Sequence, residues 1–414
     1  MTTAEPLLLA LSGEPAAGAA ALQKAWSQGR VVALAGPGEQ ERLAEALRRH
    51  GSAAALGQSL AAGVPAVLLG SGGSAGERRW CLQPLRHLQA SAAASARWLA
   101  ARGLDPAACL HLNPLPLHHV SGLLPLLRAR HSGGQVRWLA PALLRQPAAL
   151  QEAMPLPPDR PAVLSLVPTQ LARLLAEPAG VAWLRGCAVI WVGGAALPAE
   201  LARQARAEGL PLAPCYGATE TAAMVCALPP QRFLAGEQGC GPALDDVALQ
   251  LAASDGAVEV RCSRLALGWL EAGGLRPLPR SPEGWWRSGD AGRLGAAGLE
   301  VLGRLDGAIS SGGETVFPEQ LEARLRAQAR AQGLPLEAVL LLGVDDALWG
   351  QRLVALVRAQ AGADAAALVA ALQQLVAGWP AAERPQTWWP CPELAPSEAG
   401  KWQRGRWRDW WRER

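Results

Sequence analysis

Short apolar runs alternate with amphipathic stretches over the first part of the chain. Such runs are typical of strands buried inside a sheet. The expected strands are Val31–Ala35, Pro65–Gly70, Cys109–Asn113, Gln135–Ala140, Ala162–Val167, Ala188–Val192 and Leu212–Tyr216. The expected helices lie between them, at Glu39–His50, Leu85–Arg102, Thr169–Ala176 and Pro198–Glu208. This alternation predicts an α/β fold with a parallel sheet.

The pattern changes from Val247 onward. Short strand-like runs separated by glycine-rich turns predict a β-rich part over about residues 240–303. Farther on, a helical pattern at Glu319–Gln332 precedes two further apolar runs and another helical stretch. These last elements are Ala338–Gly343, Arg352–Val357 and Ala363–Ala377. We therefore expect a large N-terminal domain over residues 1–303 and a small, mobile α+β domain over residues 304–414.

The stretch Gly303–Pro318 lies between these two parts. Its adjacent glycines, Gly312 and Gly313, have a conformational freedom that no other residue type has. Pro318 suits the first turn of the helix that follows. A joint here would place Arg304 within reach of a ligand held between both parts. A surface loop that closes one domain is the alternative.

Composition and charge narrow the functional classes. Half of the 414 residues are hydrophobic, so large cores can form. The net charge of +4 equals that of the last fourteen residues, so the remainder is close to neutral, which argues against a nucleic-acid surface. The eight cysteines are scattered, which fits free thiols in a reducing cytoplasm. The N-terminus lacks a basic leader and no apolar run is long enough to span a membrane.

Arginine dominates the basic residues. Lysine occurs only at Lys24 and Lys401 among the 39 basic side chains. Because arginine presents a planar fork and lysine a compact ammonium, a lysine in such a chain can mark a site that needs a point charge. Chance placement explains either lysine equally well.

The loop Gly70–Arg79 is the first candidate for chemistry. Its glycines and serines offer close backbone N–H groups, which can wrap phosphate oxygens. It lacks the Gly-Lys-Ser/Thr sequence of a Walker loop. The spacing Gly70-x-Gly72-x-x-Ala75 matches a dinucleotide fingerprint, so an NADP-dependent reductase is an alternative. No acidic residue lies within residues 78–104, which weighs against NAD. A plain turn is the third interpretation.

Four further segments could carry function, each with an ordinary structural alternative. Leu115–Gly122 contains paired histidines that could ligate a metal or simply cap a turn. Cys215–Glu220 holds the only tyrosine, and its Thr219 and Glu220 could hold phosphate and Mg²⁺ or cap a helix. Gly284–Asp290 offers an aspartate for ribose hydroxyls. Ala395–Lys401 is a turn that presents the second lysine.

Taken together and in order, these segments resemble one family, the acyl-adenylate-forming enzymes, which include acyl-CoA synthetases. The matching segments are Ser71–Arg79, Leu115–Gly122, Tyr216–Glu220, Arg287–Asp290, Gly303–Asp306, Ser311–Glu314 and Gly400–Lys401. Within the family, His118–Gly122, Ser165–Leu171 and Gly400–Arg404 resemble the 2-succinylbenzoate–CoA ligases of menaquinone and phylloquinone synthesis, in their cyanobacterial form. The chain departs from the family in ending its phosphate loop Arg78-Arg79 instead of Pro-Lys, and in a shortened N-terminal region.

The resemblance implies a ligation in two steps. A carboxylate would attack Mg·ATP to give acyl-AMP and pyrophosphate, and CoA would then displace AMP. The implied phosphate-binding residues are Ser71, Gly72, Gly73, Ser74, Ala75, Gly76 and Arg79. The implied residues around adenine and ribose are Gly193, Gly194, Ala195, Tyr216, Gly217, Ala218, Asp290 and Arg304. Thr219 and Glu220 would serve phosphate and Mg²⁺.

The remaining implied residues handle the acid, CoA and the movement between the steps. The acid would be held by His119, Ser121, Gly122 and Thr169. The CoA channel would consist of Ser311, Gly312 and Gly313, with the hinge at Asp306. The implied catalytic residues are Lys401, which bridges carboxylate and phosphate, with His119 and Glu220.

The C-terminal tail leaves one non-catalytic alternative. Trp402, Trp407, Trp410 and Trp411 lie among arginines, as in a helix that rests on a membrane surface. The opposite interpretation is that these tryptophans pack on the small domain. The predicted partners are otherwise small molecules: a carboxylic acid, ATP and CoA.

Overall fold

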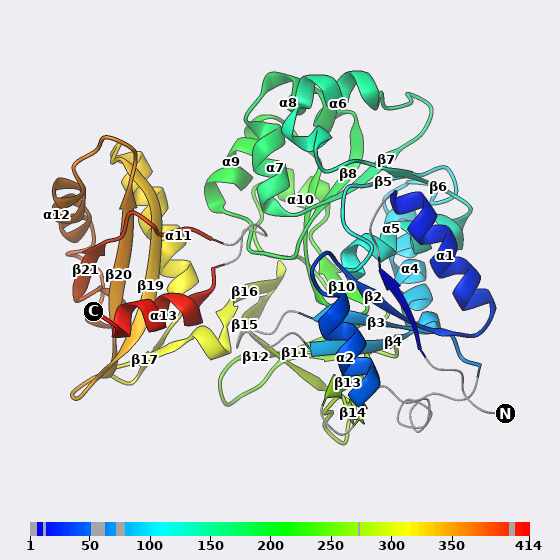
Figure 1. Ribbon diagram of the computed structural model, residues 1–414. Coiled ribbons are helices and arrows are strands. Elements are labelled where there is room, and N and C mark those ends of the chain that lie inside the picture. The colour runs from blue at the N-terminus through cyan, green and yellow to red at the C-terminus, as the bar shows by residue number, and fades with distance from the viewer. Residues whose placement is uncertain (1–5, 11–13, 51–62, 72–78, 272–273, 397–401) are drawn as a thin grey trace.

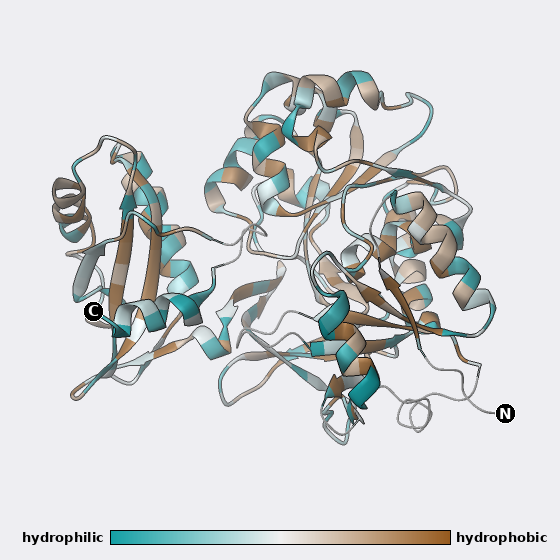
Figure 2. Ribbon diagram, in the orientation of Figure 1, coloured by the Kyte–Doolittle hydropathy of each residue, from teal (hydrophilic) through white to brown (hydrophobic). Residues whose placement is uncertain are grey.

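The computed structural model describes residues 6–10, 14–50, 63–71, 79–271, 274–396 and 402–414. Within these ranges the chain forms four β-sheets with helices packed around them (Figure 1). The strands are the most hydrophobic segments, and several of the surrounding helices carry polar faces (Figure 2). A search of the same ranges finds no helix with the length and apolar character of a membrane span.

The first sheet has the order β1-β2-β3-β4-β13-β14. Its strands are Leu7–Ala10, Val31–Ala35, Ala66–Ser71, Arg79–Pro84, Gly268–Glu271 and Gly274–Pro277, and helices α1 (Pro15–Ser27) and α2 (Gln40–His50) belong to this region. Strands β1 to β3 run parallel, whereas β4 returns antiparallel to β3 with Ser71 opposite Arg79.

That antiparallel return corrects the dinucleotide interpretation of Gly70–Ala75. A dinucleotide fingerprint requires a strand that leads into a helix. Here the loop instead joins two neighbouring strands of one ladder, because Gly70 and Ser71 pair with Trp80 and Arg79. The alternative of an NADP-dependent reductase loses its structural basis.

The second sheet has the order β10-β9-β8-β7-β5-β6, and all of its neighbours except β9 and β10 are parallel. Its strands in chain order are Leu110–Asn113, Gln135–Trp138, Ala162–Leu166, Cys187–Val192, Leu212–Ala218 and Ala223–Ala227. Helices α4 to α10 are Leu85–Ala100, Val120–Ser132, Pro147–Ala153, Pro168–Leu175, Pro178–Arg185, Ala199–Ala207 and Pro230–Leu234. The expected strands and helices of this part are confirmed to within a few residues.

The third sheet is antiparallel, with the order β11-β12-β15-β16. Its strands are Ala248–Leu251, Ala257–Arg261, Trp286–Gly295 and Gly298–Arg304. The expected β-rich part is therefore confirmed, with one addition. Strands β13 and β14, which lie between β12 and β15 in the sequence, leave this sheet and extend the first one.

The fourth sheet has the order β18-β17-β20-β19, with β21 beside β20. Its strands in chain order are Ile309–Ser311, Glu314–Val316, Leu336–Asp346, Gly350–Ala359 and Thr387–Pro390, and its helices are α11 (Pro318–Ala331), α12 (Ala365–Leu375) and α13 (Arg404–Arg412). This part lies to one side of the other three sheets (Figure 1). The α/β fold class with a small α+β part is confirmed.

The C-terminal helix α13 packs on the fourth sheet. Trp407 is 2% exposed and contacts a cluster that includes Leu340, Leu342 and Cys391. Trp389, by contrast, is 39% exposed and meets Trp411 edge-on at 5.8 Å. At least one of the four tail tryptophans therefore belongs to the protein core.

We expect Trp407→Ala to lower the free energy of unfolding by about 3–5 kcal/mol, because it empties a large core position. Trp389→Ala is the matched control and should cost about 1 kcal/mol, the value of one aromatic contact. Urea unfolding of both variants measures the difference. Similar losses in the two variants would show that α13 does not depend on its buried face.

Candidate functional site

The carboxyl ends of parallel strands meet at one edge of a sheet, where ligands bind in open α/β folds. Gly193 follows β8 at this edge, and its N–H donates to Leu166 O of β7 at 3.1 Å. A Cβ on Gly193 would lie 2.8 Å from Cys215 Sγ on β9, so the close approach requires glycine. The edge thus brings together the segments predicted to enclose adenine, Gly193–Ala195 and Tyr216.

Tyr216 and Asp290 form a direct link between the second and third sheets. The Tyr216 hydroxyl donates to Asp290 Oδ2 at 2.7 Å, and Arg304 Nη1 donates to Asp290 Oδ1 at 3.4 Å. Burial and the Asp290 charge raise the pKa of Tyr216 well above its ordinary value. Gly289 makes room for Arg304, since a Cβ there would lie 2.6 Å from Nη2. Three residues predicted for the nucleoside therefore form one polar cluster.

The turn that carries Thr219 and Glu220 is held on both sides. Gln83 Nε2 donates to Thr219 O at 2.7 Å, and Trp269 Nε1 donates to Glu220 Oε1 at 2.9 Å. The guanidinium of Arg79 lies 5.2 Å from the centroid of the Trp269 ring. Trp269 thus lies between the end of the predicted phosphate loop and the predicted Mg²⁺ ligand, a link that no local motif indicates.

Several predicted residues lie outside the described ranges. They are the loop positions Gly72, Gly73, Ser74, Ala75 and Gly76, and the catalytic candidate Lys401. The two ends of the loop are described: Ser71 is buried and its hydroxyl donates to Arg79 O at 3.4 Å.

The segment predicted to hold the acid begins helix α5. The His118 and His119 rings pack together with centroids 4.4 Å apart. In the described ranges they belong to no group of three or more side chains that could hold a metal ion. Gly122 is buried, and a Cβ there would lie 2.1 Å from Pro116 O. Ser121 and Thr169 are exposed at the starts of α5 and α7. Substrate binding by these residues stays a prediction.

Farther along α5, Arg128 is a buried cation that the sequence analysis missed. Its side chain is 5% exposed, its guanidinium lies 4.2 Å from the Trp191 ring centroid, and Nη1 contacts Ser165 Oγ at 3.5 Å. No carboxylate of a described residue pairs with it, and its Nε lacks a hydrogen-bond partner there. Burial lowers the pKa of Arg128 to about 10, so the group stays charged at neutral pH.

The position of Arg128 relates it to the site edge. Ser165 and Trp191 are the penultimate residues of β7 and β8. Burial raises the pKa of Cys215 to about 12, and the nearby Arg128 charge opposes that rise. Arg128 therefore lies beneath the carboxyl edge of the sheet, close to the residue before Tyr216. A buried cation without a resident carboxylate is suited to an anion that arrives with a ligand.

The predicted CoA segment packs against a tryptophan. Gly312 has φ of +61°, and a Cβ there would lie 2.5 Å from the Trp349 ring. The Gly312 N–H donates to Trp349 O at 2.9 Å, while Ser311 is fully buried. Glycine at this position thus has a packing reason in addition to the predicted channel.

The predicted hinge residue Asp306 lies in a short turn, Leu305–Gly307, between β16 and β17. Its carboxylate accepts from Arg304 Nη2 at 3.0 Å and from Nε at 3.2 Å. Arg304 therefore contacts both Asp290 on the third sheet and Asp306 in the connecting turn. Rotation about this turn, and the domain boundary at residue 303, stay predictions.

Comparison with known proteins gives a family and close relatives. The model of the AMP-binding enzyme family matches residues 7–262. The 2-succinylbenzoate–CoA ligase of Salmonella typhimurium is 34% identical over 253 residues, which is 60% of this chain and 49% of that protein. A probable 2-succinylbenzoate–CoA ligase of Mycobacterium tuberculosis is 29% identical over 81% of this chain and 79% of its own length.

The fold has close structural neighbours. The o-succinylbenzoate CoA synthetase of Bacillus subtilis, solved with its acyl-adenylate intermediate, has a TM-score of 0.77 at 19% identity and covers 99% of this chain and 89% of its own. The same enzyme solved with ATP and magnesium ion has a TM-score of 0.75. In sequence, the matches to the Salmonella and Escherichia coli ligases span about half the length of those relatives.

A pH test follows from His111, which is 2% exposed on β5. Burial, followed by the Arg128 charge, lowers the pKa of His111 to about 3. An unfolded histidine binds a proton near about pH 6.5, so the unfolded state holds more protons below that pH and stability falls as pH falls. Between about pH 7 and 5.5, wild type should lose about 1 kcal/mol more than His111→Gln.

Urea unfolding at both pH values measures this difference. His131→Gln, at the exposed end of α5, is the control and should follow wild type. Equal acid sensitivity of wild type and His111→Gln would mean that His111 takes up its proton without unfolding.

Proposed function

The chain belongs to the AMP-binding enzyme family, and from this premise we propose that it joins 2-succinylbenzoate to CoA through an acyl-adenylate. The observation that carries the choice of acid is the buried cation Arg128. 2-Succinylbenzoate has two carboxylates, and activation of one leaves the other anionic. Arg128 would pair with that remaining carboxylate, because a planar guanidinium matches carboxylate geometry. The curated ligases that match the sequence support the same acid.

In the first step, a carboxylate oxygen attacks the α-phosphorus of ATP, and the bond to pyrophosphate breaks. The protein's contribution to such a transfer is positioning and charge stabilisation. Arg79 and the loop that begins at Ser71 would hold the β- and γ-phosphates. Tyr216, Asp290 and Arg304 would hold the nucleoside.

Glu220 and Thr219 fit the requirements of Mg²⁺. The ion prefers a few oxygen ligands together with phosphate oxygens and water. Trp269 fixes Glu220 Oε1 at 2.9 Å, which orients the carboxylate and leaves its second oxygen to reach a cation. Bound Mg²⁺ would supply charge neutralisation for the departing pyrophosphate.

In the second step, the CoA thiol attacks the acyl carbonyl. A C–S bond forms, the C–O bond to AMP breaks, and the thiol proton passes to water. We place Ser311, Gly312 and Gly313 along the CoA path, with rotation of the small domain about Asp306 bringing them to the site. The division of the chain would be residues 1–303 and 304–414. Action in menaquinone or phylloquinone synthesis and a cytoplasmic location belong to the same proposal.

The proposal is tested by thioester formation with ATP and CoA across a panel of acids. We expect 2-succinylbenzoate to exceed a cinnamate and a fatty acid by at least about tenfold in kcat/KM, which is about 1.4 kcal/mol. 3-Benzoylpropionate, which lacks the ring carboxylate, isolates the contribution of the second anion. Better turnover of the fatty or cinnamic acid would refute the choice of substrate and leave the family intact.

The variant Arg128→Met assigns that preference to a residue. It removes the cation and keeps an unbranched side chain of similar reach. Discrimination between 2-succinylbenzoate and 3-benzoylpropionate should disappear, while turnover of 3-benzoylpropionate changes little. If Arg128→Met keeps the discrimination, the second carboxylate is bound elsewhere.

Lys401→Ala should reduce acyl-AMP formation by about 10²-fold or more, because a compact ammonium would bridge carboxylate and phosphate as like charges approach. Lys401→Arg should restore only part of the rate, since a guanidinium needs two aligned acceptors. Thioester formation from supplied acyl-AMP should be nearly unchanged in both variants. Rapid-quench kinetics of each half-reaction measures this, and a parallel fall of both would contradict a rotation between two poses.

A further inference from the structure

Two consecutive alanines adopt left-handed backbone angles just after the Thr219–Glu220 turn. The φ angle is 54° at Ala222 and 76° at Ala223. These are the non-glycine residues with positive φ in the part of the chain that the structure describes. A side chain is strained in this region, and such strain persists only where surrounding contacts hold the backbone.

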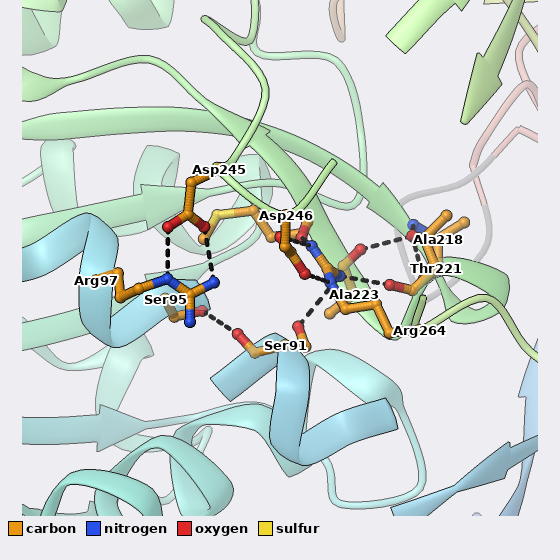
Figure 3. Close-up of polar contacts among 10 residues, drawn as sticks. Ser91, Ser95, Arg97, Ala218, Thr221, Ala223, Asp245, Asp246 and Arg264 are labelled. Atoms are coloured by element: carbon orange, nitrogen blue, oxygen red, sulfur yellow. Dashed lines mark hydrogen bonds and ion pairs between the residues drawn. The ribbon is translucent and has the colours of Figure 1, made fainter. Parts of the chain in front are cut away.

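Arg264 supplies such contacts from its place after β12, where its side chain is fully buried. Nη1 donates to Thr221 O at 2.6 Å, and Nη2 donates to Met224 O at 2.9 Å. The guanidinium therefore bridges the two carbonyls on either side of Ala222 and Ala223. Figure 3 shows Arg264 beside this turn.

The guanidinium is itself fixed by two further residues. Nε and Nη2 donate to the Asp246 carboxylate at 2.7 and 3.3 Å, and Nη1 also contacts Ser91 Oγ of α4 at 3.4 Å. A guanidinium has five N–H donors, and these contacts together with those to the turn engage all five. Arg264 is thus a rigid support, unlike the sparsely paired Arg128.

The turn is also held from within by Thr221. Its hydroxyl accepts from the Ala218 N–H at 2.9 Å and contacts Ala223 O at 2.7 Å. Gly217 fits against the same turn, because a Cβ there would lie 2.1 Å from Ala223 O. The backbone from Gly217 to Met224 is therefore determined by contacts on both sides.

We propose that Arg264 and Asp246 are a positioning pair for the turn that presents Thr219 and Glu220 to Mg²⁺ and phosphate. This inference rests on the proposed function. Arg264 bonds the backbone directly after that turn and does not itself touch the nucleotide. Its two carbonyl contacts hold the strained Ala222–Ala223 backbone, which sets the direction in which Glu220 leaves the sheet.

The test removes both charges together, in the variant Arg264→Met with Asp246→Asn. Removing Arg264 alone would leave a partly buried carboxylate without its partner, and the loss of stability would hide the local effect. The matched control is Arg97→Met with Asp245→Asn. Arg97 and Asp245 form a neighbouring pair at 2.5 and 2.8 Å, half-exposed and with no bond to the turn (Figure 3).

Hydrogen exchange of residues 219–224 reports the order of the turn and needs no substrate. In the Arg264–Asp246 double variant, exchange there should rise by at least about tenfold at an unchanged melting temperature. The Mg²⁺ concentration that half-saturates acyl-AMP formation should rise by a similar factor. Thioester formation from supplied acyl-AMP, which uses no Mg·ATP, should keep its rate. The control variant should match wild type in every measurement.

Unchanged exchange together with unchanged Mg²⁺ dependence would overturn the inference and make Arg264 a purely structural residue. If the double variant does not fold, Asp246→Asn alone, which keeps the shape of the side chain, should show intermediate increases in both. A wild-type protein that forms no acyl-AMP from any acid would refute the proposed function instead. In that case the exchange rates alone still decide whether Arg264 orders the turn.

Discussion

The hydrogen bond from Tyr216 to Asp290 joins two sheets that are otherwise built independently. Burying a phenol is costly unless its hydroxyl is paired, and Asp290 accepts that hydrogen bond at 2.7 Å. Asp290 in turn lies opposite Arg304 in the β15–β16 ladder, so one pairing register also sets where the guanidinium lies. Arg304 continues the contact to Asp306, in the turn that leads to the fourth sheet. The nucleoside-binding candidates and the connection to the small domain thus share one polar chain.

Three buried or half-buried arginines show how partner supply separates structure from function. Arg264 engages all its donors within the described residues, and Arg404 bonds both Glu319 and Glu322. Arg128 has a tryptophan face and one long contact to Ser165. Because a buried charge costs several kcal/mol without a counter-ion, the unpaired member of the three is the one that a ligand can complete.

The predicted architecture followed from patterns that are local. The buried strands β2, β7 and β8 appeared as short apolar runs, and α7, α9 and α11 had clear periodicity. Helix α5 was missed because it contains Pro125 and is buried around most of its circumference, so no polar face marks its period. The loop after β3 was open to a dinucleotide interpretation because the partner strands of β4 are distant: β13 comes from nearly two hundred residues later.

The site shows the same division. Motif residues such as Tyr216 and Asp290 could be named in advance, whereas the residues that orient them could not. Trp269 reaches Glu220 across 49 positions, and Arg264 reaches Thr221 across 43. Such side chains have no local signature, since a buried tryptophan or arginine reads as ordinary core or surface until the fold places it. Contacts of this range depend on the whole topology and not on spacing within a motif.

The last helix extends this logic to the small domain. Arg404, at the start of α13, bonds Glu319 and the buried Glu322 of α11, and its Nη1 donates to Leu341 O at 2.7 Å. These bonds fix the chain three residues after Lys401 to the first helix beyond the connecting turn. Any rotation about Asp306 therefore carries that end of the lysine segment with it as part of one body. The single lysine of the C-terminal region is thus tied to the element whose movement the two-step chemistry requires.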